Sequence, residues 1–407
     1  MDFVPKARER ICQLLNRGVD IPNPETIDIG SEVNIEQIAA KDVKIYPGCR
    51  LYGGKTVISA GCRLGHEAPV TIEDCQLGEK VELKGGFFSG SVFLEKANMG
   101  MGAHVREASI LEEQASGAHC VGLKQTILFP FVTLGSLINF CDCLMSGGTS
   151  RQNHSEVGSS YIHFNFTPDA DKTTPSLLGD VPRGVMLNQP PIFLGGQGGI
   201  IGPVRLGYGN VVAAGSILRH DYPEDNKLIC ETGNAGNIKN YVKTLYPNIG
   251  RVVENNIIYL ANLTALEAWY TDIRKPFMES RPLGNLIYAG AMEKLSLAKK
   301  ERSKRLKALA EKASASGRRE LQEQMAFIEG IFVGRFAAES PDVKKYRDAF
   351  LQGFAKAAGR SKDDYIETIQ GLPAAVSVKG VKWLASLVDD ICNKVRKVMP
   401  SVYQGKR

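Results

Sequence analysis

The amino-acid sequence predicts a mainly β protein, a parallel β-helix of hexapeptide repeats, followed by an α-helical C-terminal domain. The first observation is that apolar residues recur at every sixth position between about residues 27 and 218. The series include Ile45, Leu51 and Val57, then Ile58, Leu64 and Val70, and later Ile200, Leu206, Val212 and Leu218. A period of six fits neither an amphipathic helix nor a flat strand with its period of two. The second observation is that the apolar spacing becomes helical after Tyr222.

Repeats of six residues require stacking, because one short strand cannot bury its own apolar side chain. We expect three strands of about six residues in each coil, and so about 18 residues per coil. Gly often follows the apolar residue, as at Gly65, Gly78 and Gly207, where the chain must turn a corner. A β-sandwich is the alternative, but it would show a period of two and hairpin turns.

The chain begins with an amphipathic helix in residues 1–20, which we expect to cap the first coil. Without a cap, that coil would expose apolar core and unpaired strand edge. The β-helix is expected over residues 21–222, with polar, Gly- and Pro-rich excursions at about 139–156 and 166–191. Excursions from a rigid stack often carry functional sites, and a disordered insertion is the alternative.

Residues 238–407 are predicted to form the α-helical domain. Its clearest apolar stripe consists of Val381, Leu384, Leu387, Val388, Ile391, Val395 and Val398. Residues 294–319 form a basic helix, which could contact an acidic partner or an anionic membrane face, or remain a solvated surface. The helical domain is therefore a candidate site for a protein partner.

Composition favours a globular protein of the cytoplasm. The net charge is +6 without a strongly basic run, which argues against nucleic acid as a partner. No stretch has the roughly 18 apolar residues of a membrane span, and residues 1–20 lack an export signal. Nine scattered cysteines suit a reducing compartment. Cys141 and Cys143 have no second pair at zinc-ligand spacing, so we expect no metal site.

Arg106, Lys124 and Asp142 follow one another at intervals of 18 residues, so we expect them to stack on one face. The segment from Phe129 to Phe131 could disturb the second step. Two cations about 5 Å apart, one strand spacing, repel unless an anion lies beside them. A phosphate group would supply that anion, with Arg offering a planar fork and Lys a point charge. Two unrelated surface cations are the alternative.

The order of the motifs resembles the acetyltransferase half of the bifunctional N-acetylglucosamine-1-phosphate uridyltransferase and glucosamine-1-phosphate acetyltransferase family. The matching segments are LLNRGVDIPNPETIDI, SAGCRLG, LGEKVEL, VREASILEEQASGAHCVGLK, VGSSYIHFNFTPDADKTTPSLLGD and IIGPVRLGYGNVVAAGSIL. The resemblance covers roughly residues 7–222. About 26 residues precede the coils, too few for a nucleotide-binding α/β domain, so nucleotide transfer is not expected.

The resemblance implies a left-handed β-helix, a homotrimer with sites between neighbouring coils, and acetyl-CoA as co-substrate. Carried over residue by residue, Arg106 and Lys124 match the family's sugar-phosphate cations. Asn165 matches its Asn, and Lys172 matches a basic residue in the following loop. The segments that line the acetyl-CoA groove contain Ser159, Gly195, Gly196, Ala213 and Ala214.

The sequence departs from this family at the catalytic base. The family uses a His to deprotonate the sugar ammonium so that the amine can attack the thioester. One alignment places Asp142 at that position, and a shifted alignment places Ser136 there. A carboxylate with a pKa of about 4 is a poor base for an ammonium unless burial raises that pKa. His154 and His163 are the other candidates. Two tyrosines of the family are replaced by Met145 and Phe166.

Three functions remain open from the sequence. The first is acetyl-CoA-dependent N-acetylation of an amino-sugar phosphate such as glucosamine-1-phosphate, in the UDP-N-acetylglucosamine or cell-envelope precursor pathway. The second is a non-catalytic trimer that binds a sugar phosphate or UDP-sugar and has lost the catalytic His. The third is a structural trimer whose helical domain recruits a partner.

Overall fold

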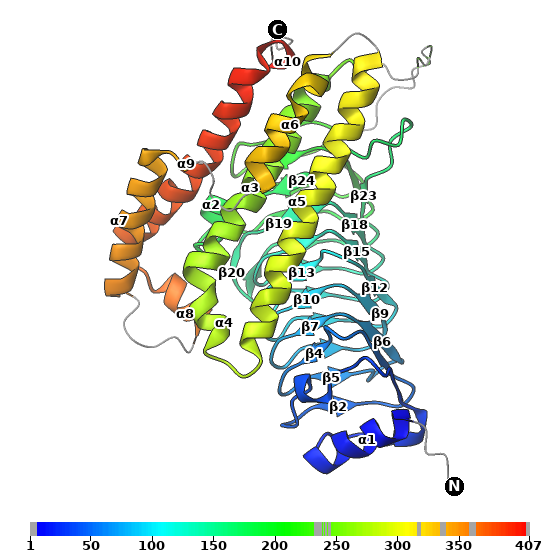
Figure 1. Ribbon diagram of the computed structural model, residues 1–407. Coiled ribbons are helices and arrows are strands. Elements are labelled where there is room, and N and C mark those ends of the chain that lie inside the picture. Colours follow the sequence, from blue (N-terminus) through cyan, green and yellow to red (C-terminus); the bar gives the residue numbers. More distant parts are fainter. Residues whose placement is uncertain are drawn as a thin grey trace.

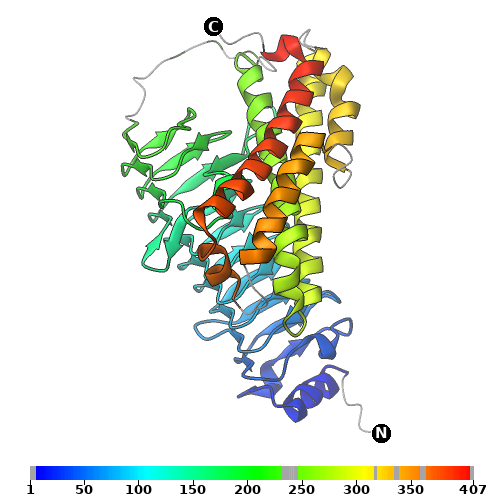
Figure 2. The same ribbon diagram turned by 90° about the vertical axis from the view of Figure 1, so that its left-hand side faces the viewer.

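The computed structural model describes residues 6–231, 246–315, 319–333, 339–357 and 364–403, together with positions 238, 240 and 242. It confirms the predicted fold class, a parallel β-solenoid followed by a helical region. The helices after residue 246 lie along one side of the solenoid (Figures 1 and 2). At the N-terminal end, α1 (Lys6–Arg17) buries Ile11 and Leu14 and covers the first coil.

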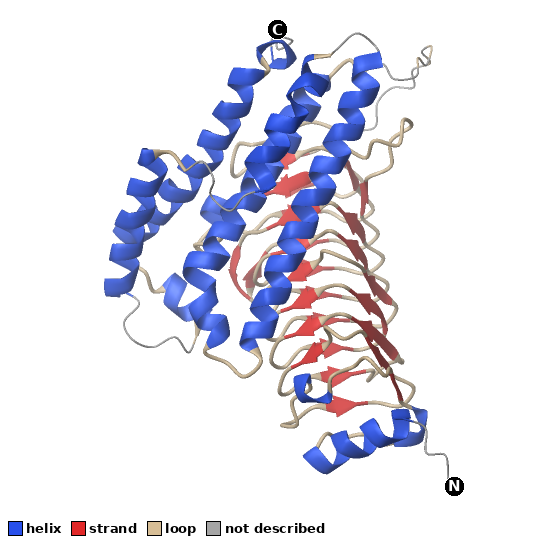
Figure 3. Cartoon of the chain, viewed as in Figure 1, coloured by secondary structure: helices blue, strands red, loops and turns tan. Residues whose placement is uncertain are grey.

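The solenoid has three faces, each formed by one parallel sheet (Figure 3). Sheet 1 contains β1 (Asp28–Ile29), β3 (Arg50–Tyr52), β6 (Val70–Glu73), β9 (Gly86–Ser89), β12 (Ala103–Val105), β15 (Gly122–Lys124), β18 (Asn139–Cys141), β23 (Ile162–Phe164), β26 (Gly199–Ile201) and β29 (Ile217–Leu218). Sheet 2 contains β4 (Val57–Ile58), β7 (Gln76–Leu77), β10 (Val92–Phe93), β13 (Ile110–Leu111), β16 (Ile127–Leu128), β19 (Cys143–Met145), β24 (Ser176–Leu178) and β27 (Arg205–Leu206). Sheet 3 contains β2 (Lys44–Ile45), β5 (Arg63–Leu64), β8 (Glu82–Leu83), β11 (Asn98–Met99), β14 (Ser116–Gly117), β17 (Thr133–Leu134), β22 (Glu156–Val157), β25 (Phe193–Leu194), β28 (Val211–Val212) and β30 (Leu228–Ile229).

The six-residue period produces the core of the solenoid. In sheet 3, Ile45 pairs with Leu64, Leu64 with Leu83, and the next coil adds Met99 through the pairing of β8 with β11. All four side chains are fully buried. Each coil thus places one apolar residue on top of the last, and the stack pools them into a continuous core.

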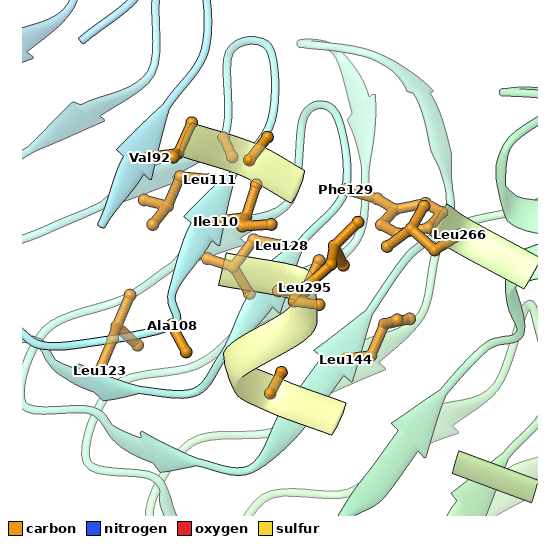
Figure 4. Close-up of a cluster of buried hydrophobic side chains, with 14 of the residues drawn as sticks. Val92, Ala108, Ile110, Leu111, Leu123, Leu128, Phe129, Leu144, Leu266 and Leu295 are labelled. Carbon is orange, nitrogen blue, oxygen red and sulfur yellow. The ribbon is translucent and has the colours of Figure 1, made fainter. Parts of the chain in front are cut away.

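Sheet 2 differs from the other two sheets because most of its strands are apolar on both sides. In β13 and β16, both residues of each strand are buried, whereas β2 and β5 of sheet 3 each combine a buried residue with one that is half-buried or exposed. The outward side chains of sheet 2 pack under α3 (Ile249–Trp269) and α5 (Gly284–Ala315). Figure 4 shows Leu266 of α3 and Leu295 of α5 in this cluster of buried side chains.

The other helices complete the region that covers sheet 2. They are α2 (Val181–Gly184), a π-helical segment (Tyr270–Arg274), α4 (Lys275–Glu279), α6 (Glu320–Val333), α7 (Pro341–Ala357), α8 (Tyr365–Gln370), α9 (Ala374–Val398) and α10 (Pro400–Tyr403). Helix α3 is central, because it packs against sheet 2, α5 and α9. Its side chains are therefore buried almost all round.

Three segments of the solenoid differ from the boundaries that the sequence pattern predicts. The strand β24 keeps its place in sheet 2 within the predicted excursion at 166–191. The strands β18 and β19 keep their places in sheets 1 and 2 within the predicted excursion at 139–156. The excursion is confined to residues after Met145 and contains the hairpin of β20 (Gly148–Ser150) and β21 (Asn153–His154). At the other end, β30 continues sheet 3 beyond residue 222.

Ion pairs fix the helical region to the turn between sheets 2 and 3. Glu79, Glu95 and Glu113 occupy the same turn in three successive coils, and we call them the acidic ladder. Arg281 lies 2.9 Å from Glu79 and 3.0 Å from Glu95, and Arg274 pairs with Glu113. The acidic ladder therefore specifies where the helices sit along the solenoid.

Arg274 is the most deeply buried member of this cluster. Its guanidinium lies 3.1 Å from the Glu112 carboxylate, and both side chains are almost fully buried. The Tyr270 hydroxyl donates a hydrogen bond to Glu112 at 2.7 Å. Burial raises the pKa of Glu112, and the positive charge of Arg274 opposes that shift. Removing the cation would leave two buried or half-buried carboxylates unpaired.

We predict that Arg274→Met lowers the free energy of unfolding by about 3 to 5 kcal/mol, the usual cost of breaking one side of a buried ion pair. Arg281→Met is the matched control, because the Arg281 side chain is 33% exposed. Its loss should cost about 1 kcal/mol or less. Urea unfolding of both variants measures the difference. If both substitutions lowered the free energy of unfolding equally, the buried ion pair of Arg274 would not contribute more stability than the exposed ion pairs of Arg281.

Candidate functional site

Arg106 and Lys124 lie side by side at the turn from sheet 1 into sheet 2. The strands β12 and β15 pair Val105 with Leu123, so the next residues of the two strands are opposite each other. The Arg106 amide donates to the Leu123 carbonyl at 2.8 Å. The spacing of 18 residues therefore holds for this step, and the two cations are separated by one strand spacing, about 5 Å.

Asp142 does not continue this stack, which corrects the predicted second step. Lys124 pairs with Cys141 rather than with Asp142, because this coil is one residue shorter than the preceding one. The shortening occurs in the turn after Lys124, as the pairing of Ile110 with Ile127 shows. Asp142 takes the left-handed conformation of the turn (φ 62°).

Lys172 joins Arg106 and Lys124 around the Cys141 thiol. Burial raises the pKa of Cys141, and the positive charges of Arg106, Lys124 and Lys172 all oppose that shift. Lys172 belongs to the loop that follows β23 and returns to sheet 2 at β24. The Lys172 carbonyl accepts a hydrogen bond from Arg302 at 3.1 Å, and Arg302 pairs with Asp142 of this turn, so three of the sequence-predicted substrate residues lie at one turn. We call Arg106, Lys124 and Lys172 the cation corner.

A carboxylate that sequence reasoning missed lies within the cation corner. The Glu107 carboxylate is 2.6 Å from the Lys124 ammonium, and its side chain is 51% exposed. Partial burial raises the pKa of Glu107, but the hydrogen bonds that the carboxylate accepts from Lys124 and from its own backbone, together with the positive charges of Lys124 and Arg106, outweigh burial and lower the pKa. The Arg106 guanidinium has no hydrogen bond or ion pair to any other residue that the structure describes.

Helix α5 covers the next position of the turn with Arg302. The Arg302 guanidinium lies 2.8 Å from the Asp142 carboxylate, and the two side chains are 3% and 4% exposed. Arg302 also donates to the Gln125 side chain and to the Lys172 carbonyl, both at 3.1 Å. The Asp142 carboxylate is therefore paired and buried beneath a helix.

Asn165 contacts the same carboxylate. Burial raises the pKa of Asp142, while Arg302 and a hydrogen bond from the Asn165 side chain oppose the shift. Asn165 is thus held beside the cation corner through Asp142. Sequence reasoning could not identify Arg302, because its partner lies far away in the chain and no local motif links the two.

The two histidines proposed from the sequence do not point into the cation corner. His163 points into the solenoid, is 2% exposed, and has its Nε2 2.8 Å from the Ser176 hydroxyl. His154 lies on the β20–β21 hairpin, on the other side of sheet 2, with its Nδ1 2.8 Å from the Arg151 carbonyl oxygen. Within one chain, neither imidazole reaches Arg106 or Lys124.

A second group of predicted residues is stacked at the turn from sheet 3 into sheet 1. The Gln197 amide donates to the Ser159 carbonyl, and the Gly195 amide donates to the Val212 carbonyl, both at 2.8 Å. A Cβ added to Gly195 would lie 2.3 Å from the Ala214 backbone nitrogen, so the coils approach closely here. The members of this small-residue corner are Ser136, Ser159, Gly195, Gly196, Ala213 and Ala214.

The small-residue corner includes a histidine that sequence reasoning did not consider. His119 is exposed, and its Nδ1 lies 2.9 Å from the Ser136 hydroxyl oxygen. The Ser136 amide donates to the Ser159 hydroxyl oxygen at 3.2 Å. His119 lies one coil before Ser136. The pairing of β14 with β17 places Gly117 opposite Leu134, so His119 and Ser136, two residues further along, occupy equivalent positions of the turn.

The uncovered faces expose apolar side chains near the C-terminal end of the solenoid. Phe193, Val211 and Leu228 are exposed and stack on one another in sheet 3. Phe164 and Ile201 are exposed partners in sheet 1. Exposed apolar residues that adjoin one another are typical of interaction surfaces.

The described residues form neither a metal-binding cluster nor a membrane-spanning helix. Cys141 and Cys143 are buried free thiols. Among the residues that the structure describes, no group of three His, Cys, Asp or Glu side chains could hold a metal ion. No helix within the described ranges is both long and apolar enough to cross a bilayer.

The fold and motifs define a hexapeptide-repeat β-solenoid protein, and comparison with known proteins supports the resemblance drawn from the sequence. The chain is similar to three proteins named bifunctional protein GlmU. That of Trichlorobacter lovleyi is 28% identical over 227 residues, which is 55% of this chain and 44% of the relative. Those of Thermotoga maritima and Geobacillus sp. are each 27% identical, over 53% and 58% of this chain and 42% and 46% of their own lengths. The chain spans less than half the length of these relatives. No protein-family model matches it.

We predict that His163→Gln changes how stability depends on pH. Burial lowers the pKa of His163 to about 4, whereas the unfolded chain has the ordinary value of about 6.5. As the pH falls, the unfolded state binds the proton first, so the native state loses up to about 3 kcal/mol between pH 6.5 and 4. Above about pH 6.5 this loss is absent. The variant should lack this acid-dependent loss in urea unfolding across that pH range.

The exposed His66 provides the control for this measurement. His66→Gln should show the same pH dependence of unfolding as the unmodified chain. A His163→Gln variant that keeps the full acid-dependent loss would show that His163 is not the buried neutral group described here.

Proposed function

We propose that this chain is an acetyl-CoA-dependent N-acetyltransferase that acts on an amino-sugar phosphate such as glucosamine-1-phosphate. The observation that carries the proposal is the convergence of Arg106, Lys124 and Lys172 at one turn. A phosphate dianion would neutralise two of these positive charges and accept charge-assisted hydrogen bonds from them. The similarity to the bifunctional GlmU proteins supports the reaction class.

The reaction needs a base for the sugar ammonium. Asp142 is paired with Arg302 and buried, so it is not the group that we propose. His119 is exposed and lies in the small-residue corner, next to Ser136. In this proposal the ammonium gives its proton to His119, and the free amine attacks the acetyl carbonyl of acetyl-CoA. The C–S bond breaks, the departing thiolate takes the proton from the imidazolium, and the new amide nitrogen releases its surplus proton to solvent.

A complete site in this proposal needs more than one chain. The cation corner and the small-residue corner are at opposite ends of the sheet 1 strands, so one chain does not bring them together. The proposed homotrimer would place the cation corner of one chain beside the small-residue corner of the next. The exposed apolar residues of sheets 1 and 3, including Phe164 and Phe193, support an assembly through these two faces. The nine free cysteines suit a protein of the cytoplasm.

A second candidate function is a non-catalytic trimer that binds a sugar phosphate or UDP-sugar. Two observations favour it: Asp142 is buried beneath α5, and His154 and His163 point elsewhere. Such a protein would keep the cation corner but would not turn over acetyl-CoA. Both candidate functions predict binding of the sugar phosphate, but only the acetyltransferase predicts turnover of acetyl-CoA.

We predict that the chain releases CoA thiol from acetyl-CoA when glucosamine-1-phosphate is supplied. Arg106→Ala should lower kcat/KM by about tenfold to a hundredfold, as expected when a charged hydrogen bond to phosphate is lost. Thiol release is followed with a chromogenic thiol reagent. Ligand-induced thermal stabilisation of the same samples reports binding separately.

Arg50→Ala is the control, because Arg50 is an exposed cation on β3 of the same sheet, outside the cation corner. It should leave both readouts unchanged. Stabilisation by glucosamine-1-phosphate that depends on Arg106, without thiol release, would favour the non-catalytic candidate. Absence of both would overturn the two candidates together.

A further inference from the structure

The cation corner contains a carboxylate that has no role in the proposed acetyl transfer. Glu107 directly follows Arg106, and its carboxylate lies 2.6 Å from the Lys124 ammonium. About half of the Glu107 side chain is exposed. A ligand that reaches Arg106 and Lys124 from solvent therefore also meets a negative charge.

We propose that Glu107 binds the ammonium group of the acceptor and makes the cation corner selective for phosphorylated amino sugars over phosphorylated neutral sugars. This inference rests on the proposed function, since it assigns the acceptor that the same turn would take. Glu107 contacts the ligand while the amine of the sugar is still protonated, before the base removes that proton.

The charges of the turn are complementary to a ligand that carries both a negative and a positive charge. Arg106, Lys124 and Lys172 supply three positive charges and Glu107 one negative charge, while Asp142 and Arg302 neutralise each other. A phosphate dianion with an ammonium on the adjacent sugar carbon presents the complementary arrangement. A neutral sugar phosphate would leave the Glu107 carboxylate close to the phosphate with no compensating cation of the ligand.

The geometry allows Lys124 to contact both the Glu107 carboxylate and the phosphate of the ligand. Its ammonium has three N–H donors, so it can keep the bond to Glu107 and still donate to a phosphate. The Arg106 guanidinium has no side-chain partner within the described residues and can offer its planar fork to the same phosphate. Glu107 is then held beside the phosphate site rather than displaced from it.

Two other carboxylates near this turn pair with arginines of α5 rather than with a cation of the site. Asp142 is buried with Arg302, and Glu301 lies 2.6 Å from Arg305 on α5. Glu107 pairs with a cation of the site itself and keeps an exposed side chain. It is therefore the carboxylate that we assign to the ammonium.

The test compares three ligands by calorimetry: glucosamine-1-phosphate, glucose-1-phosphate and inorganic phosphate. The unmodified chain should bind the amino sugar about tenfold more tightly than the neutral sugar, the effect of one charge-assisted hydrogen bond. Glu107→Gln should reduce this preference to about twofold or less, while inorganic phosphate binds as tightly as before or more tightly. Glu107→Asp keeps the charge and should retain part of the preference.

Glu73→Gln is the matched control, because Glu73 is exposed at the end of β6, on the same turn two coils earlier. It should keep the full preference. Thermal melting of each variant establishes that it is folded.

The outcomes separate this inference from the proposed function. If the unmodified chain binds both sugar phosphates equally, or if Glu107→Gln keeps the tenfold preference, Glu107 does not select the amine. In either case, binding that depends on Arg106 would leave the phosphate site standing. If the chain binds none of the three ligands, both proposals are overturned.

Discussion

The architecture depends on one constraint, which is that sheet 2 must be covered on its outer side. Six of its eight strands place an apolar residue outward as well as inward, as Ile110 and Leu111 do in β13, whereas β7 and β27 have Gln76 and Arg205 in the outward position. Exposing this face would leave a large apolar surface in water. The helices α3 and α5 remove it from solvent, and sheets 1 and 3 are left open. The outer faces of sheets 1 and 3 are therefore the faces of the solenoid that α3 and α5 leave open.

The charged groups at the same interface decide how the helices sit, which apolar packing alone does not. Apolar contacts are non-directional, so α5 could slide along sheet 2 at little cost. The acidic ladder and Arg274 fix the register near the start of α5, and Arg302 fixes it again about five turns later at Asp142. Because Arg302 also donates to the Lys172 carbonyl, the position of the helix is transmitted to the loop that carries Lys172. The helical region is therefore coupled physically to the cation corner.

Much of the fold could be predicted from the sequence, and the reasons for success and failure are local. The period of six predicts the coils, and a spacing of 18 residues places Lys124 beside Arg106. The same rule fails at Asp142, because a turn can lose one residue without disturbing the strands around it. His163 occupies an inward slot opposite Ile200, but the long excursion between them hides this pairing in the sequence. Arg302 reaches the site from a different region, and no periodicity within the coils encodes it.

The separation of the cation corner from the small-residue corner follows from the geometry of a three-sided coil. The strands of sheet 1 run from one corner to the other, so their length sets the distance between Lys124 and the His119–Ser136 pair. A small amino sugar cannot bridge a whole face, so a site built by one chain would leave its amine far from His119. Two chains that meet through sheets 1 and 3 can bring opposite corners together, because sheet 2 is already occupied by α3 and α5. The helical cover of sheet 2 thus restricts which faces can meet and, through them, which corners can form a site.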